Sequence, residues 1–210
     1  MKRAFVATAN ATILLALSAP TTGAQNGVAT NPGLAPAGRY RVVRDHTQVV
    51  FAIMHLGLSP YYGRFTGATG TLNFNPLDPV RSNVSIEIDT STVSTPSDEL
   101  SKILCAANAF ECATFPKAIF KSTMVMRNGD NTGDMTGNLT VHGVTKPVTL
   151  HVTFHGGRPG LLGTSGYDLG FSAEATVKRS DFGLTKMLWA TTVADEVKLL
   201  IEAEFEQDTP

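Results

Sequence analysis

Apolar and polar residues alternate along most of the chain after Tyr40, and this period-two pattern is the feature that most restricts the fold. In residues 84–89, for example, branched apolar side chains alternate with Ser85, Glu87 and Asp89. Side chains at this spacing point to opposite faces of a β-strand. The pattern predicts eight strands, which lie within residues 40–54, 71–75, 84–89, 118–127, 134–141, 148–155, 167–178 and 196–206.

The segments between the strands favour antiparallel neighbours. Residues 128–131 and 155–160 are rich in Gly, Asn and Pro, which suit tight turns. A sheet of such strands buries its apolar face and removes its free edges when it closes into a barrel. We therefore expect an all-β fold, an eight-stranded antiparallel barrel. Its interior is either filled by side chains or wide enough for one small ligand.

The first residues have the pattern of a targeting signal. Lys2 and Arg3 precede an apolar stretch, and a run of small residues follows it. This pattern predicts a secretory signal peptide over residues 1–24, and with it export to the periplasm. Residues 25–38 are rich in Gly, Pro and Asn, so we expect a flexible lead-in there and a folded domain at 39–207. No later apolar run is long enough to span a bilayer, so no stable membrane insertion is expected after cleavage.

A single short helix is expected between the third and fourth strands. Thr95 can cap it, Pro96 suits its first turn, and the acidic residues that follow favour the positive end of the helix dipole. The apolar positions of this helix form one stripe, which comprises Leu100, Ile103, Leu104 and Ala107. The spacing is equally compatible with a lid beside the barrel and with a plug in one end.

The two cysteines, Cys105 and Cys112, flank the end of this helix. An unbroken helix would separate their Cα atoms by about 10 Å, which is too far for a disulfide. A bond therefore requires the helix to end first. We expect that bond, because export places the chain in an oxidising compartment.

Charge and motifs exclude several classes of function. The 17 basic and 18 acidic residues leave a formal charge of −1, so no broad positive field is available to hold nucleic acid. The sequence contains no G-x-S-x-G, H-E-x-x-H, P-loop or G-x-G-x-x-G pattern. We therefore expect a protein that is not an enzyme and has no cofactor.

The histidines favour structural roles. His151 and His155 lie four residues apart on a predicted strand, about 13 Å from each other, so they do not ligate one metal ion. His142 shares their polar parity, and no metal site is expected. His46 and His55 bracket an apolar run, and His55 can end its inward face. An acid–base role for either of these two is the enzymatic alternative.

Seven segments, taken together, resemble one known family, the YceI-like, polyisoprenoid-binding family. They are DHTQVVFAIMHLGLS at 45–59, GRF at 63–65, GTL at 70–72, FPKAIFKS at 115–122, GNLTVHGVTKPV at 137–148, RSDFG at 179–183 and DEV at 195–197. The match covers about residues 40–206, with the segments in the family's order. The resemblance implies a lipocalin-like eight-stranded barrel, which agrees with the strand count, and the predicted helix is then one short α-helical insertion in it. It also implies a bacterial secreted or periplasmic protein that holds an isoprenoid chain, such as a prenyl pyrophosphate or a quinone tail.

The chain departs from the family's pattern in two places. Segment 105–112 carries a cysteine pair that most relatives lack, and it has fewer charges than usual. The resemblance therefore does not define the geometry of the barrel entrance near this segment. The apolar parity also switches between Phe65 and Leu72, where Gly67 and Gly70 indicate a bulge.

The expected ligand-binding residues are the apolar, inward-facing set, with His55 at its rim. They are Phe51, Ile53, His55, Leu72, Phe74, Val84, Ile86, Ile88, Phe120, Met124, Leu139, Val141, Leu150, Val152, Phe171, Leu199 and Ile201. Among the basic residues, Arg179 is the first candidate for neutralising a pyrophosphate head group, because it ends a strand in a family-like motif, and Arg64 is the second.

Three classes of function remain open. The resemblance favours non-catalytic carriage of an isoprenoid lipid inside a hollow barrel, and another long-chain amphiphile is the alternative ligand. A filled barrel would instead suit a stress-related interaction module, and the third class is an enzyme acting on a hydrophobic small molecule. The period-two pattern does not distinguish a hollow barrel from a filled one. A homodimer is compatible with the sequence, which does not set the oligomeric state.

Overall fold

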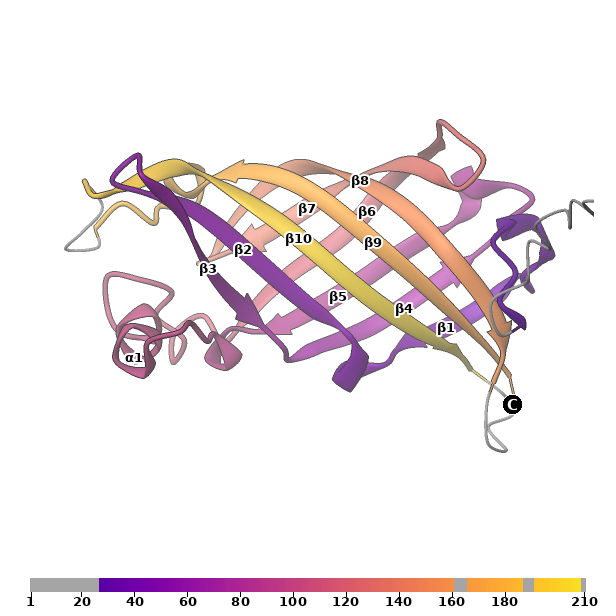
Figure 1. Ribbon diagram of the computed structural model, residues 1–210, viewed down its shortest axis with the longest axis horizontal. Helices are drawn as coiled ribbons and strands as arrows, with labels where there is room; N and C mark the ends of the chain where they lie inside the picture. Colours follow the sequence, from indigo (N-terminus) through magenta and orange to yellow (C-terminus); the bar gives the residue numbers. More distant parts are fainter. Residues whose placement is uncertain (1–26, 161–165, 187–190, 209–210) are drawn as a thin grey trace, which may run out of the picture.

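Ten strands and one α-helix form within residues 27–160, 166–186 and 191–208, which a computed structural model describes. The strands are β1 (Gly38–Val42), β2 (Gln48–His55), β3 (Ser59–Phe65), β4 (Ala68–Phe74), β5 (Asn83–Asp89), β6 (Lys117–Arg127), β7 (Thr132–Val141), β8 (Val144–Pro159), β9 (Tyr167–Lys178) and β10 (Val193–Gln207), and the helix is α1 (Asp98–Cys105). Short 3-10 helices are η2 (Pro32–Leu34), η3 (Arg44–His46), η4 (Pro79–Arg81), η5 (Thr90–Thr92) and η6 (Arg179–Phe182). Figure 1 shows the strands wrapping around one long axis, with α1 at one end.

The sheet closes on itself because β1 and β2 both pair with β10. Its order is β1-β4-β5-β6-β7-β8-β9-β10-β2-β3, with an additional β1–β10 pairing. Strand β2 pairs with β10 between Val193 and Glu202, and β1 pairs with it between Phe205 and Gln207. Thus β1 and β2 share one position around the ring, as do β3 and β4, which pair with them. The predicted closed, eight-strand antiparallel barrel is confirmed.

Two of the ring positions are interrupted. Helix η3 divides the strand expected at 40–54, and β3 was not expected, because its sequence SPYYGRF lacks a regular alternation of apolar and polar residues. Gly67 lies between β3 and β4, where a Cβ atom would be 2.7 Å from side-chain atoms of both Asp89 and Thr92. The inward-facing positions therefore do change from odd to even numbers between Phe65 and Leu72, as expected. The change occurs at a break between β3 and β4 rather than at a bulge.

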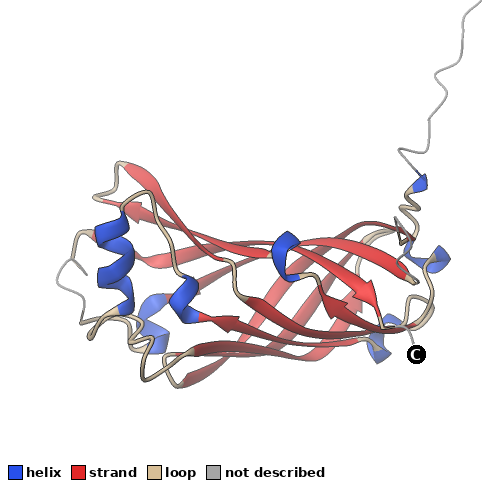
Figure 2. Cartoon of the chain, turned by 90° about the horizontal axis from the view of Figure 1, so that it is seen from below, coloured by secondary structure: helices blue, strands red, loops and turns tan. Residues whose placement is uncertain are grey.

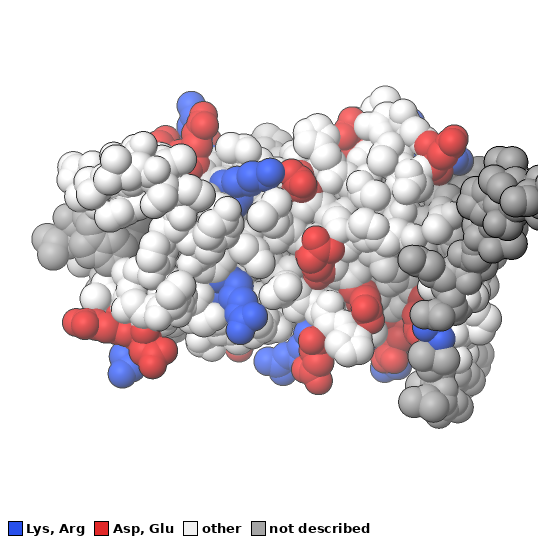
Figure 3. Space-filling view, viewed as in Figure 1, with Lys and Arg blue, Asp and Glu red and all other residues white. Residues whose placement is uncertain are grey.

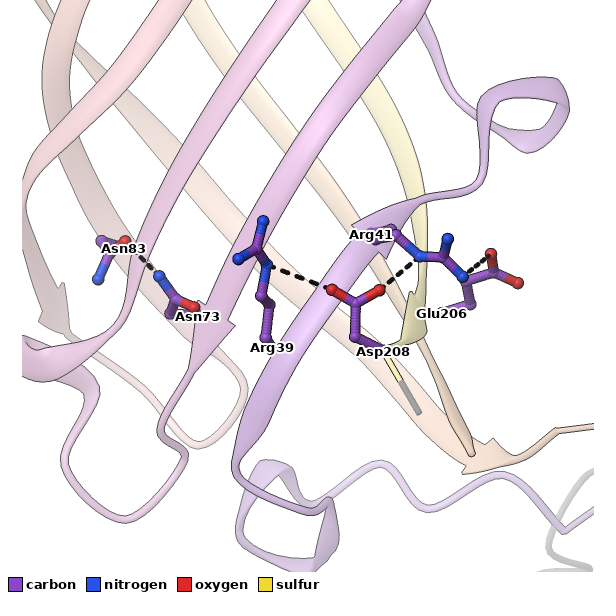
Figure 4. Close-up of polar contacts among 6 residues, drawn as sticks. All are labelled: Arg39, Arg41, Asn73, Asn83, Glu206 and Asp208. Carbon is purple, nitrogen blue, oxygen red and sulfur yellow. Dashed lines mark hydrogen bonds and ion pairs between the residues drawn. The ribbon is translucent and has the colours of Figure 1, made fainter. Parts of the chain in front are cut away.

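Charged side chains bridge the seam where β1 meets the end of β10 (Figure 4). Arg41 Nη2 lies 3.2 Å from Glu206 Oε1, and its Nε lies 2.5 Å from Asp208 Oδ1. Arg39 Nε lies 3.2 Å from the other oxygen of the same carboxylate. Exposed ion pairs contribute little individually, about 0–1 kcal/mol, but two of these share the Asp208 carboxylate and two share Arg41, so they form a network across the closing strands.

Helix α1 begins two residues later than expected. Ser97 is its N-cap, with the hydroxyl oxygen accepting a hydrogen bond from the Leu100 N–H at 3.2 Å. The Thr95 hydroxyl instead accepts from the Ser97 N–H. The expectation that Thr95 caps the helix is therefore wrong. The cap is Ser97, and Pro96 precedes it instead of lying in the first turn. Figure 2 shows α1 at one end of the strands.

The helix ends at Cys105, as a bond to Cys112 requires. The two cysteines form a disulfide, with their Cα atoms 5.0 Å apart. The residues after α1 turn back on the helix, since the Phe110 N–H donates to the Leu104 carbonyl at 2.9 Å. The disulfide therefore joins the last residue of α1 to the loop that leads toward β6.

The segment before β1, of which residues 27–37 are described, is attached to the barrel. Ala29 and Gly157 of β8 exchange two backbone hydrogen bonds, at 2.8 and 2.9 Å. Ala35 is buried, and the Tyr40 hydroxyl donates to the Pro36 carbonyl at 2.7 Å. These contacts hold the segment against β8 and β1.

The expected signal peptide, residues 1–24, lies outside the described residues. Within the part of the chain that the structure describes, no helix has the length and apolar character needed to cross a membrane.

Candidate functional site: the barrel cavity

The interior of the barrel contains a cavity of about 730 Å³. Its volume is within the range of roughly 300–1,000 Å³ that is typical of small-molecule sites. The wall is almost entirely apolar and is formed by the inward faces of the strands, together with side chains of α1 and of several loops. The barrel is therefore hollow, and the alternative of an interior filled by its own side chains is wrong.

Small residues opposite large ones leave this space open. In the β9–β10 register, Ala173 pairs with Ile201 and Ala203 pairs with Phe171, and all four line the cavity. An alanine beside a large side chain fills less of the lumen than two large residues would. The alternation along each strand therefore gives an apolar wall. Because Ala173 and Ala203 are small, side chains from opposite sides of the barrel do not meet in the lumen.

Aromatic rings form a connected cluster in the half of the barrel nearer to β1. The ring centroids of Phe154 and Phe171 are 5.2 Å apart, and those of Phe171 and Phe205 are 5.8 Å apart. Phe74 extends the cluster to Tyr40, at 6.1 Å, and Tyr40 is fully buried. Aromatic pairs at such distances stabilise by about 0.5–1.5 kcal/mol beyond their buried area. This half of the cavity wall is therefore rigidly packed.

The other end of the cavity is bordered by α1 and the following loop, and we call this end the mouth. Leu100 and Leu104 of α1 line the cavity, as does Phe110. The ring of Phe110 packs edge-on against Phe65 of β3, with centroids 5.3 Å apart. The helix thus covers the mouth with its apolar face, an arrangement that fits both the lid and the plug interpretation. The disulfide fixes the end of this cover.

Arg179 lies at the mouth and lines the cavity. Its Nε donates to the Ala194 carbonyl at 3.0 Å, and its Nη1 donates to the Leu184 carbonyl at 2.7 Å. The guanidinium group therefore holds the two sides of the connection between β9 and β10 together. Beside it, the Ser180 hydroxyl donates to the Asp195 carboxylate at 2.7 Å, and this hydrogen bond lowers the pKa of Asp195.

Comparison with known proteins identifies the family. The family model described as the YceI-like domain matches residues 40–205. The chain belongs to the YceI-like family. Protein YceI of Salmonella arizonae is similar to it, with 40% identity over 174 residues, which cover 82% of this chain and 88% of that protein.

Solved structures share the barrel of this YceI-like chain. A Campylobacter jejuni YCEI protein has a TM-score of 0.65 and 26% identity, over 74% of this chain and 90% of its own. Burkholderia cenocepacia BcnA has a TM-score of 0.68 and 23% identity, over 78% and 98%. A polyisoprenoid binding domain from Saccharophagus degradans, implicated in plant cell wall breakdown, has a TM-score of 0.59 and 16% identity, over 82% and 100%. At these identities, the last two show the fold alone.

The YceI-like cavity includes all the expected ligand-binding residues except Met124. The β6–β7 register shifts between Ser122 and Met124, so the side-chain parity of β6 changes there. As a result Val125 lines the cavity, whereas Met124 is 48% exposed on the outside. The interpretation of Met124 as a lining residue is wrong for this reason.

Arg64 also lies away from the cavity. It follows Gly63, which pairs with inward-facing Phe51, so alternation along β3 turns its side chain outward. There it borders a shallow outer groove together with Arg44 and His46. Arg64 is therefore not part of the cavity wall, and of the two head-group candidates only Arg179 lines the cavity.

Some lining residues were missed. Val49 has the same parity as Phe51 and Ile53, so the alternation of β2 could have identified it. Tyr61 and Phe65 line the cavity from β3, whose sequence gave no strand signal. Leu184 lies in a connection without periodicity, and no sequence pattern could have placed it on the wall.

The histidines lie where the sequence suggested, with His142 as the exception. His55 ends β2 and lines the rim of the cavity. His46 and His151 are exposed and pair with acidic side chains of neighbouring strands, through Nδ1, at 2.7 and 2.6 Å. His142 is in the turn between β7 and β8, not on a strand, and its Nε2 lies 3.2 Å from Glu111 Oε1.

One outer cluster has the residue types of a hydrolase but not their order. The His155 Nε2 atom is 2.5 Å from Ser172 Oγ, and the Ser172 hydroxyl donates to Glu202. In a catalytic triad the histidine lies between the nucleophile and the carboxylate, whereas here the serine does. Within the described residues, no group of three or more His, Cys, Asp or Glu side chains is placed to hold a metal ion.

Proposed function

We propose that this YceI-like protein binds and carries an isoprenoid lipid in the periplasm, without covalent chemistry. The observation that carries the proposal is the hollow, apolar cavity of about 730 Å³, whose lining includes the exposed residue His55 at one end. Burying a hydrocarbon chain there is favourable by about 25 cal/mol per Å² of apolar surface removed from water. The solved polyisoprenoid binding domain with the same fold and the secretory pattern of residues 1–24 support the proposal.

The cavity volume limits the length of a chain that can be buried. Each added isoprene unit buries more apolar surface until the cavity of about 730 Å³ is full. Affinity for prenyl alcohols in a fluorescence-displacement assay should therefore rise with chain length and then level off. Affinity that does not depend on chain length would contradict binding along the cavity.

A lumen-filling variant tests whether the chain lies inside the barrel. Ala173 is buried and lines the cavity, so Ala173→Phe places a ring in the lumen. Thr176 is exposed on the same strand, and Thr176→Phe is the matched control. We expect the first variant to lose prenyl binding by at least tenfold and the second to keep it, with both still folded by circular dichroism. Equal affinity in both variants would sink the proposal.

Arg179 is the residue we propose for contact with a charged head group. Two of its N–H groups already bond backbone carbonyls, so the side chain is held in place at the mouth. Arg179→Gln should weaken binding of a prenyl pyrophosphate much more than that of the matching prenyl alcohol. Equal losses for the two ligands would show that Arg179 acts only through the loop that it holds.

A further inference from the structure

The β2–β3 hairpin ends in exposed apolar side chains at the mouth of the barrel. Leu56 is 58% exposed and Leu58 is 81% exposed, and only Gly57 separates them. Met54 and Tyr62, on the strands behind them, are also exposed. In Figure 1 the hairpin lies at the same end of the barrel as α1. We call these four large side chains, Met54, Leu56, Leu58 and Tyr62, the apolar tip.

The turn itself does not explain why Leu56 is present. Leu56 has φ +52° and Gly57 has φ +70°, and the Leu58 N–H donates to the His55 carbonyl at 2.9 Å. A β-turn with positive φ at both central positions favours Asn-Gly there. A leucine is unfavourable in this region of φ. Strained residues of this kind cluster at functional sites, so the exposed side chain of Leu56 needs a role outside the fold.

The hairpin is free of formal charge over a long stretch. From Gln48 to Gly63 the sequence contains no Asp, Glu, Lys or Arg. In Figure 3 the surface is white where the hairpin tip lies, and charged atoms occupy other parts of the same end. An apolar medium can cover such a surface without removing a charged group from water, a step that would carry a large penalty.

The opposite end of the barrel provides a contrast. Leu77 and Val80, in the connection between β4 and β5, are 85% and 69% exposed. That connection also carries Asp78 and Arg81, so burying it would desolvate two charged side chains. Exposed apolar residues are therefore present at both ends, but only the apolar tip belongs to a hairpin without formal charge.

The apolar tip is continuous with the wall of the cavity. Ile53, His55 and Tyr61 belong to the same hairpin and line the cavity near its mouth. We propose that the apolar tip docks the mouth of the barrel on the surface of a lipid bilayer, so that a lipid chain passes between bilayer and cavity along this hairpin. The purpose of docking rests on the proposed lipid cargo, but docking itself is measured separately.

Apolar contact, not charge, drives this docking. The charged residues that border the mouth on β9, η6 and β10 have both signs, as Lys178, Asp181 and Asp195 illustrate. Binding should therefore be similar for vesicles of phosphatidylcholine and for vesicles that also contain phosphatidylglycerol. It should also persist in about 1 M salt, where the Debye length falls to about 3 Å.

The test is co-sedimentation of the purified protein with these vesicles. Full burial of one leucine side chain corresponds to roughly tenfold to a hundredfold in a partition constant. Leu56→Asn/Leu58→Asn should therefore lower partitioning by at least tenfold, while its matched control, Leu77→Asn/Val80→Asn, retains it. Asparagine tolerates the positive φ at position 56, so we expect the tip variant to unfold at an equal or higher Tm than the wild type.

Three results would overturn docking: a wild type that stays in the supernatant, a tip variant that sediments like the wild type, and equal losses in the two variants. A dimer in vesicle-free solution that the tip variant dissociates would also overturn it, because the tip would then be covered by a second copy. Binding of a soluble prenyl alcohol separates docking from cargo. Sedimentation without prenyl binding refutes the proposed cargo but not docking. Prenyl binding without sedimentation refutes docking but not the cargo.

Discussion

The ring of Phe51 occupies the space beside Gly63 on the neighbouring strand, where a Cβ atom would lie 2.2 Å from the ring Cζ. The two residues are partners in the β2–β3 register. We expect Gly63→Ala to force the ring from its position and to lower the free energy of unfolding by about 1–3 kcal/mol, as overpacking does elsewhere. Urea denaturation measures this change.

A second glycine provides the control for this substitution. A Cβ atom at Gly170 of β9 would meet no atom closer than 3.9 Å. Gly170→Ala should therefore leave stability unchanged or raise it by about 0.4–1 kcal/mol, because alanine restricts the unfolded chain. If both alanine variants lost the same stability, the contact with Phe51 would not be the cause.

Alternation along the strands was enough to predict the barrel and most of its wall. Ile53 and Leu199 line the cavity as expected, because their paired segment, from Val197 to Glu202 of β10, has no register shift. The prediction failed at Met124, where a register shift inverts the parity of β6, and at Arg64, on a strand without an alternating sequence. The empty space depends on the summed volumes of side chains from many strands, which no local pattern contains.

The buried phenol of Tyr40 should make stability depend on alkaline pH. Burial raises the pKa of Tyr40 from 10.0 to about 12. Above pH 10 the unfolded state releases this proton while the folded state keeps it. The stability that Tyr40 contributes is thus present below pH 10 and is lost as the pH rises toward 12 and beyond.

Tyr40→Phe isolates this effect. At neutral pH the variant should be less stable by about 1 kcal/mol, because the hydrogen bond to the Pro36 carbonyl is lost. Between pH 10 and 12 the free energy of unfolding of the wild type should fall relative to that of the variant by up to about 1.4 kcal/mol per pH unit. Urea denaturation at several pH values measures the difference, and a constant difference across this window would refute the assigned pKa.

The disulfide between Cys105 and Cys112 should stabilise the cover of the mouth more than the barrel. The two residues are separated by 7 positions, and closing so short a loop contributes at most about 2.5 kcal/mol. Replacing both cysteines with serine should lower the free energy of unfolding by no more than this amount. It should also speed hydrogen exchange in α1 with little change in β8 or β9. Equal acceleration throughout the barrel would contradict a local role.

The most direct test of lipid carriage is the occupancy of the cavity in the natural protein. Native mass spectrometry of protein purified from the cells that make it, followed by solvent extraction, identifies any bound molecule. We predict an added mass that matches an isoprenoid lipid and that is absent from the Ala173→Phe variant produced in the same way. An empty wild-type protein, or a bound lipid that the variant retains, would contradict carriage of an isoprenoid in the barrel.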